Sequence, residues 1–122
     1  LLVDDNDDFR SATLAWIATE PSLAIAGDAA SGEEAIDATQ RLLPDVVLVD
    51  VVMPGLDGFE TTRRLKALST SPSVVMTSFL DTELTRLEAE RAGADAFVSK
   101  GDLTDRLRSV IGDVVNSNHD LI

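Results

Sequence analysis

The chain has 122 residues, with 22 Asp or Glu against 10 Lys or Arg, so its formal net charge is -12 at pH 7. This length suits one domain with a sizeable core, and the negative charge argues against binding of nucleic acid or of an anionic membrane surface by this chain. Without cysteine the chain has no disulfide, thiolate metal site or catalytic thiol, and it has no apolar run of membrane-spanning length and no visible signal peptide.

Short apolar runs alternate with longer amphipathic segments along the first half of the chain. The predicted elements are, in order, a strand at residues 1–3, a helix at 7–19, a strand at 23–26, a helix at 31–43 and a strand at 46–49. Ser31 and Glu34 form a capping box, in which each side chain can accept a hydrogen bond from the other residue's backbone N–H. Pro21 and Pro44 follow the two helices and end them, since proline cannot continue a helix.

The second half of the chain continues this alternation after a loop at Pro54 and Gly55. The predicted elements are a helix at residues 59–68, a strand at 74–76, a helix at 82–92, a strand at 96–98 and a helix from 102 to about 114. Asp81 or Thr82 can cap the fourth helix, and Gly93 is its expected C-terminal stop. Residues 116–122 are predicted to be a frayed end or the start of a linker, so the folded domain is expected to span residues 1–115.

Five strands that alternate with five helices predict an α/β fold, in which helices cover both faces of a parallel sheet. Right-handed crossovers bring the carboxyl ends of all strands to one edge of the sheet. The residues that follow the strands therefore gather there: Asp4, Asp5, Asp50, Thr77 and Lys100. Three aspartates brought together repel one another, so the cluster needs a cation or a chemical use.

Five short motifs occur in order along the chain, each at the end of a predicted strand. They are Asp4-Asp5, Pro44-Asp45 leading to Asp50, Met53-Pro54-Gly55-Leu56-Asp57-Gly58, Thr77-Ser78, and Gly93-Ala94-Asp95 leading to Lys100. Each motif is weak alone, but in this order and spacing the chain resembles the receiver domain of bacterial two-component response regulators over essentially its whole length. The resemblance implies a doubly wound, flavodoxin-like (CheY-like) sheet of five strands in the order 2-1-3-4-5.

Asp50 is the phosphoacceptor that this resemblance implies, because in the family the acid at this position attacks a phosphoryl donor and becomes an acyl phosphate. The resemblance also implies a Mg²⁺ site, with Asp5 as a direct ligand and Asp4 acting through water. Asp50 and the backbone carbonyl of Val52 would complete the protein's share of the ligands. Oxygen ligands of this kind suit Mg²⁺, which prefers a near-octahedral shell and keeps several waters.

Lys100 and Thr77 are the other site residues that the resemblance implies. The Lys100 ammonium would neutralise charge on the transferring phosphoryl group. Thr77 would donate a hydrogen bond to a phosphoryl oxygen, and the ring of Phe97 would then turn inward. This switch would re-form the face made by the fourth helix, the fifth strand and the fifth helix, where an output domain, a partner or a second copy in a homodimer would bind.

The expected phosphoryl donor is a sensor histidine kinase or a phosphotransfer protein, and the expected location is the cytoplasm. Gly101 follows Lys100 where many receivers have proline, which resembles the NarL and LuxR subclass. The output of that subclass is a helix-turn-helix DNA-binding domain, and this chain contains none, so transcription regulation would act through a domain outside it. Val52 and Phe79 lie at positions that tune phosphorylation and dephosphorylation rates in the family.

Two other functions fit part of the pattern. A phosphatase of the haloacid dehalogenase class also places a nucleophilic Asp after a strand with Mg²⁺, but it needs a second acid two positions later, where this chain has Val52. A degenerate receiver would act as an interaction module without phosphorylation, but the presence of Asp50, Thr77 and Lys100 argues against it. Helix capping would by itself explain Asp4 and Asp5, if the other site residues were absent.

Overall fold

The structure is a computed structural model that describes residues 1–119 of the chain. Its strands are β1 (Leu2–Val3), β2 (Asp28–Ala29), β3 (Val46–Asp50), β4 (Ser73–Ser78) and β5 (Ala96–Ser99). Its helices are α1 (Asp7–Ile17), α2 (Gly32–Leu42), α3 (Gly58–Lys66), α4 (Glu83–Ala92) and α5 (Leu103–His119), with a 3-10 turn at Lys100–Asp102 before α5. The strands form one parallel sheet in the order β2-β1-β3-β4-β5, which confirms the predicted α/β fold and strand order.

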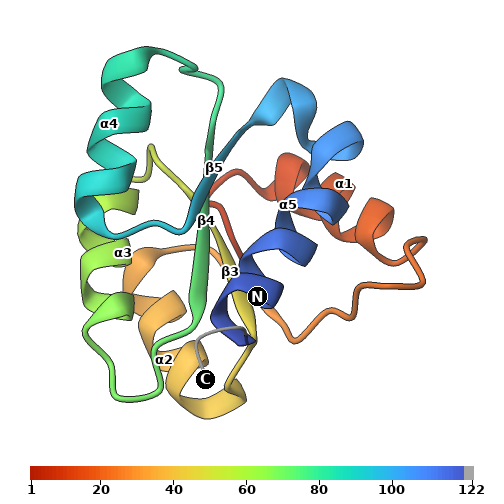
Figure 1. Ribbon diagram of the computed structural model, residues 1–122, viewed down its shortest axis with the longest axis horizontal. Coiled ribbons are helices and arrows are strands. Elements are labelled where there is room, and N and C mark those ends of the chain that lie inside the picture. The colour runs from red at the N-terminus through yellow and green to blue at the C-terminus, as the bar shows by residue number, and fades with distance from the viewer. Residues whose placement is uncertain (120–122) are drawn as a thin grey trace.

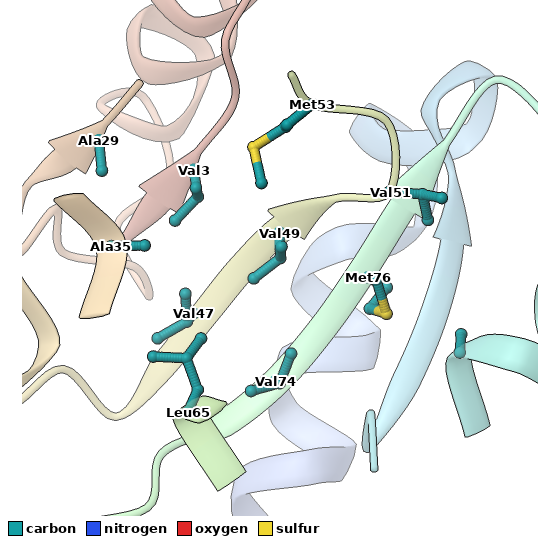
Figure 2. Close-up of a cluster of buried hydrophobic side chains, with 11 residues drawn as sticks. Val3, Ala29, Ala35, Val47, Val49, Val51, Met53, Leu65, Val74 and Met76 are labelled. Carbon is teal, nitrogen blue, oxygen red and sulfur yellow. The ribbon is translucent and has the colours of Figure 1, made fainter. Parts of the chain in front are cut away.

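Helices cover both faces of the sheet (Figure 1). α2, α3 and α4 lie on one side, and α1 and α5 lie on the other. Successive side chains of a strand point to opposite faces, so both faces of the central strands must be apolar. Val47 and Val49 of β3 join the cluster on the α2–α4 side (Figure 2), while Leu48 and Val75 join the cluster with α5.

The helix ends follow the predicted capping signals closely. Ser31 accepts a hydrogen bond from the backbone N–H of Glu34 at 3.2 Å, but the Glu34 carboxylate accepts from the N–H of Ala30 at 2.7 Å. The predicted capping box is therefore only partly formed, because the Glu34 side chain caps the N–H of Ala30 rather than that of Ser31. Thr82 caps α4 through the backbone N–H of Thr85, and Gly93 ends it in the left-handed conformation with φ of 100°.

The second strand differs from the prediction of a strand at residues 23–26. β2 is formed by Asp28 and Ala29, which pair with Leu2 and Val3 of β1. Residues 23–26 are apolar enough for a strand, but no β1 residue lies opposite them in this register, so they lack a ladder partner. Pairing with β1, rather than local hydrophobicity, therefore decides where β2 lies.

The last helix is longer than the sequence pattern predicts. α5 runs from Leu103 to His119, so residues 116–119, predicted as a tail, continue the helix, and residues 120–122 lie outside the described part of the chain. Leu107 and Val114 bury its apolar face against the sheet. Among residues 1–119, the structure has no helix with the length and apolar character of a membrane span.

Candidate functional site

Acidic and basic side chains meet at the carboxyl edge of the sheet. Asp4 follows β1, Asp50 is the last residue of β3, and Lys100 follows β5. Thr77 lies in β4, directly opposite Asp50 in the parallel register. The structure thus brings together the residues that were predicted to gather at this edge, because all five strands run in the same direction.

Three carboxylates form the acidic part of this site. One oxygen from each of Asp4, Asp5 and Asp50 lies within 4.8 Å of the others. Asp4 and Asp50 are buried, with 1% and 5% of their surface exposed, whereas Asp5 is exposed. An all-oxygen cluster that is open on one side matches the ligand preference of Mg²⁺, which keeps part of its water shell. The residues present therefore fit such an ion.

Lys100 supplies the positive charge of the site. Its Nζ lies 2.8 Å from Oδ2 of Asp4 and 3.3 Å from Oδ2 of Asp50, and its side chain is only 6% exposed. Among the described residues, Asp4 Oδ2 has no hydrogen bond of good geometry, so ion pairing with Lys100 is what compensates its charge. Buried carboxylates without such a partner would carry a large desolvation cost.

The charged form of Asp50 is disfavoured by its surroundings. The pKa of Asp50 is raised from 3.8 to about 6, mainly because burial disfavours the charged form; the charge of Lys100 opposes this rise and the charge of Asp4 adds to it. The backbone N–H of Val52 donates a long hydrogen bond of 3.4 Å to Asp50 Oδ1 and compensates little of the charge. A second cation would therefore bind to a carboxylate pair that one lysine only partly neutralises.

Thr77 lies opposite Asp50 in the sheet, and Phe97 lies in the next strand, β5. Thr77 is 1% exposed, and its hydroxyl Oγ1 has no hydrogen-bond partner among residues 1–119. A buried hydroxyl without a partner is unfavourable in the resting protein, so it is available to a group that arrives later. Phe97 pairs with Met76 in the β4–β5 ladder, and the guanidinium of Arg86 lies 5.0 Å from the centre of its ring.

Val52 and Phe79 border the site as exposed apolar side chains. Val52 is 59% exposed and Phe79 is 71% exposed. Both positions follow the carboxyl end of a central strand, β3 or β4, so they flank the approach to Asp50.

Two residues, Arg10 and Gly58, support the site in roles that were not predicted from the sequence. Arg10 of α1 donates to the backbone carbonyl of Asp4 at 2.7 Å and pairs with Asp7 and Asp28, so it braces the loop after β1. Gly58 begins α3 against the backbone of Asp50, where a Cβ atom would overlap the Asp50 carbonyl oxygen. Neither role has a local sequence signal, because both depend on contacts between distant segments.

Comparison with known proteins shows the family. Residues 1–112 match the family described as the response regulator receiver domain. The chain therefore belongs to the response regulator receiver domain family and is a signalling module.

Relatives with different outputs share this domain. The chain is 36% identical over 124 residues to protein-glutamate methylesterase/protein-glutamine glutaminase 1 of Methanosarcina mazei, covering 90% of this chain and 34% of the relative. It is 34% identical over 100 residues to the nitrate/nitrite response regulator protein NarL of Escherichia coli strain K12, covering 82% of this chain and 46% of the relative. The chain thus spans between a third and a half of these relatives, and the methylesterase activity named for the first lies in a different domain.

A solved structure confirms the fold. The two-component response regulator of the LuxR family from Aurantimonas sp. SI85-9A1 has a TM-score of 0.88 and 27% sequence identity to this chain, with 95% of this chain and 83% of that chain covered. The family, the CheY-like fold and the relation to LuxR-type regulators are therefore as the sequence predicted.

Proposed function

We propose that Asp50 accepts a phosphoryl group from a sensor histidine kinase or a phosphotransfer protein, in a Mg²⁺-dependent reaction that switches an output. The observation that carries this proposal is the position of Asp50. Its carboxylate ends the central strand β3 beside two further acids, with the Lys100 ammonium 3.3 Å away. Membership in the receiver family supports the same role.

The transfer step needs only a carboxylate nucleophile and neutralised charge. A carboxylate oxygen of Asp50 forms a bond to phosphorus, and the bond from phosphorus to the donor's imidazole nitrogen breaks. The bonding electrons stay on that nitrogen, which takes up a proton from solvent. Phosphoryl transfer of this kind is promoted mainly by positioning and by positive charge near the equatorial oxygens.

We assign the Mg²⁺ site to Asp5, Asp4, Asp50 and the backbone carbonyl of Val52. When bound, the ion supplies positive charge to the phosphoryl oxygens. Lys100 supplies the second positive charge, and its ion pairs with both buried acids support this assignment. The catalysis of this domain is confined to its own phosphorylation and dephosphorylation.

We further propose that Thr77 responds to the phosphorylation of Asp50. Its unpartnered hydroxyl would donate a hydrogen bond to a phosphoryl oxygen, and Phe97 would turn inward behind it. This movement would re-form the face of α4, β5 and α5, which would bind an output domain or a partner, or a second copy in a homodimer.

The proposed output is transcription regulation through a helix-turn-helix DNA-binding domain outside this chain, as in the NarL and LuxR subclass. The relative NarL and the solved regulator of the LuxR family support this proposal. Residues 1–115 are proposed as the receiver and residues 116–122 as the connection to that output, while this chain itself binds neither nucleic acid nor membrane. Family membership also supports a cytoplasmic location.

Mass spectrometry after incubation with acetyl phosphate and Mg²⁺ tests the central proposal. The wild type is expected to gain one phosphoryl group, and Asp50→Asn is expected to gain none. Asp45→Asn is a matched control, because Asp45 is an exposed acid at the opposite end of β3 and should be phosphorylated like the wild type. An unmodified wild type, or equal modification of Asp50→Asn, would contradict the proposal.

A further inference from the structure

The ammonium of Lys100 also lies against two aromatic rings, those of Phe9 and Phe79. Its Nζ is 4.2 Å from the centre of the Phe9 ring and 5.2 Å from the centre of the Phe79 ring. The two rings meet edge to face, with centres 5.9 Å apart and planes at 74°. Phe9 and Phe79 thus form an aromatic pair.

The aromatic pair joins two separate segments across the site. Phe9 lies in the first turn of α1, where its backbone N–H donates to the capping side chain of Asn6 at 2.9 Å. Phe79 lies in the loop after β4 and is 71% exposed, so its ring is not held by the core. Among the described residues, its ring contacts the ring of Phe9 and the ammonium of Lys100. The pair therefore meets where the start of α1 and the loop after β4 lie against the lysine.

The position of the two rings allows a cation–π attraction to the Lys100 ammonium. The face of an aromatic ring carries partial negative charge and attracts an ammonium within about 6 Å of its centre, most strongly where water is excluded. Lys100 is nearly buried, so its contact with Phe9 lies at the stronger end of this range. The lysine stem is flexible and has a large rotamer entropy. The rings restrict that freedom without adding another hydrogen-bond acceptor.

We propose that Phe9 and Phe79 are positioning residues that hold the Lys100 ammonium against Asp4 and Asp50, with Phe9 as the main contributor. This inference rests on the phosphorylation of Asp50 proposed above. Because phosphoryl transfer depends on positive charge that is already in place, loosening the ammonium lowers the rate of phosphorylation. Phe79 is exposed, whereas Phe9 is half-buried and packs against the core cluster that contains Leu107, so a test at Phe9 must keep an apolar side chain there.

Lysine NMR provides a readout of this contact that does not depend on phosphorylation. The chain has two lysines, Lys66 and Lys100, so a sample labelled with ¹³C at the lysine Cε gives two signals. Lys66 is an internal reference, because it pairs with Asp95 at 3.0 Å and donates to the carbonyl of Pro72. The Hε protons of Lys100 are expected upfield of those of Lys66 through the ring current of Phe9. This difference is expected to shrink in Phe9→Leu, and an unchanged Lys100 signal in that variant would refute the contact.

The rate of phosphorylation by acetyl phosphate and Mg²⁺ tests the consequence. Phe9→Leu keeps an apolar side chain but removes the ring, and is expected to react about 2- to 30-fold more slowly, the factor that corresponds to a typical cation–π contact. Phe9→Tyr keeps the ring and is expected to react like the wild type. Phe59→Leu is a matched control, because Phe59 lies in α3 and the rings that contact the Lys100 ammonium among the described residues are those of Phe9 and Phe79, and it is expected to leave the rate unchanged.

The outcomes separate this inference from the proposed function. An equal rate in Phe9→Leu and wild type, or a rate in Phe9→Tyr as low as in Phe9→Leu, would overturn the positioning role. If the wild type is not phosphorylated at all, the proposed function fails, and the positioning role in catalysis fails with it. The NMR signals of Lys100 would then still show whether the rings hold the ammonium.

Discussion

Replacing Asp50 with asparagine is expected to stabilise the metal-free protein above about pH 6. The pKa of Asp50 is raised from 3.8 to about 6 in the folded protein, mainly by burial; Lys100 opposes this rise and the charge of Asp4 adds to it. The folded state then binds more protons than the unfolded state between about pH 4 and 6, so stability falls as the pH rises through this window. Above the window the whole cost of the buried charge is present.

The magnitude follows from the size of this shift. A rise of roughly two pKa units corresponds to about 3 kcal/mol of free energy between the charged and neutral forms. Asparagine has nearly the same shape without the charge, and Lys100 keeps Asp4 as its partner at 2.8 Å. Relaxation around the charge reduces the gain, so Asp50→Asn is expected to raise the free energy of unfolding by about 1–3 kcal/mol.

Urea denaturation with a chelator present measures this difference. The gain of Asp50→Asn over the wild type is expected at about pH 8 and is expected to vanish towards about pH 4, where the folded wild type is protonated at Asp50. Asp37→Asn is a suitable control, since Asp37 is an exposed acid on α2 whose pairing with Arg41 at 3.6 Å contributes little. A variant that is no more stable than the wild type at about pH 8, or whose gain persists undiminished at about pH 4, would refute the electrostatic reasoning.

Three further substitutions test the site and its support. Mg²⁺ at about 100 times its dissociation constant is expected to stabilise the wild type by about 2.7 kcal/mol in thermal melts. The variant Asp5→Asn is expected to lose most of this stabilisation. The control variant Asp8→Asn, at an exposed acid outside the cluster, is expected to keep it. Thr77→Val is expected to unfold with equal or about 1 kcal/mol higher free energy in urea, because the buried hydroxyl has no partner among the described residues; a clear loss would mean that the hydroxyl is already bonded. Gly58→Ala is expected to lower the free energy of unfolding by about 1–3 kcal/mol, since its Cβ would lie 2.7 Å from the Cα of Val51. Gly112→Ala is the control, because Gly112 has open space around it in α5, and it is not expected to destabilise the protein. Equal stability of the two variants would contradict the packing argument.

Local patterns in the sequence were enough to predict most elements and the location of the site. Apolar runs and helical spacing marked β1, β3, β4 and β5 and all five helices, because burial imposes these periods on the chain. Asp50 could be predicted at a site with Asp4 and Lys100 because parallel strands end at the same edge of a sheet. The clustered acids then indicated a need for a cation, and the resemblance to receiver domains implied phosphoryl chemistry.

Only the tertiary structure decided which atoms meet and how charged they are. β2 lies at Asp28–Ala29 because the register with β1 selects those residues, although residues 23–26 are more apolar. The aromatic contact with Lys100 and the raised pKa of Asp50 arise from distances and burial that join segments far apart in the chain. A sequence specifies such contacts only through the complete fold, since the electrostatic energy of a group depends on its neighbours in space rather than on its neighbours in the chain.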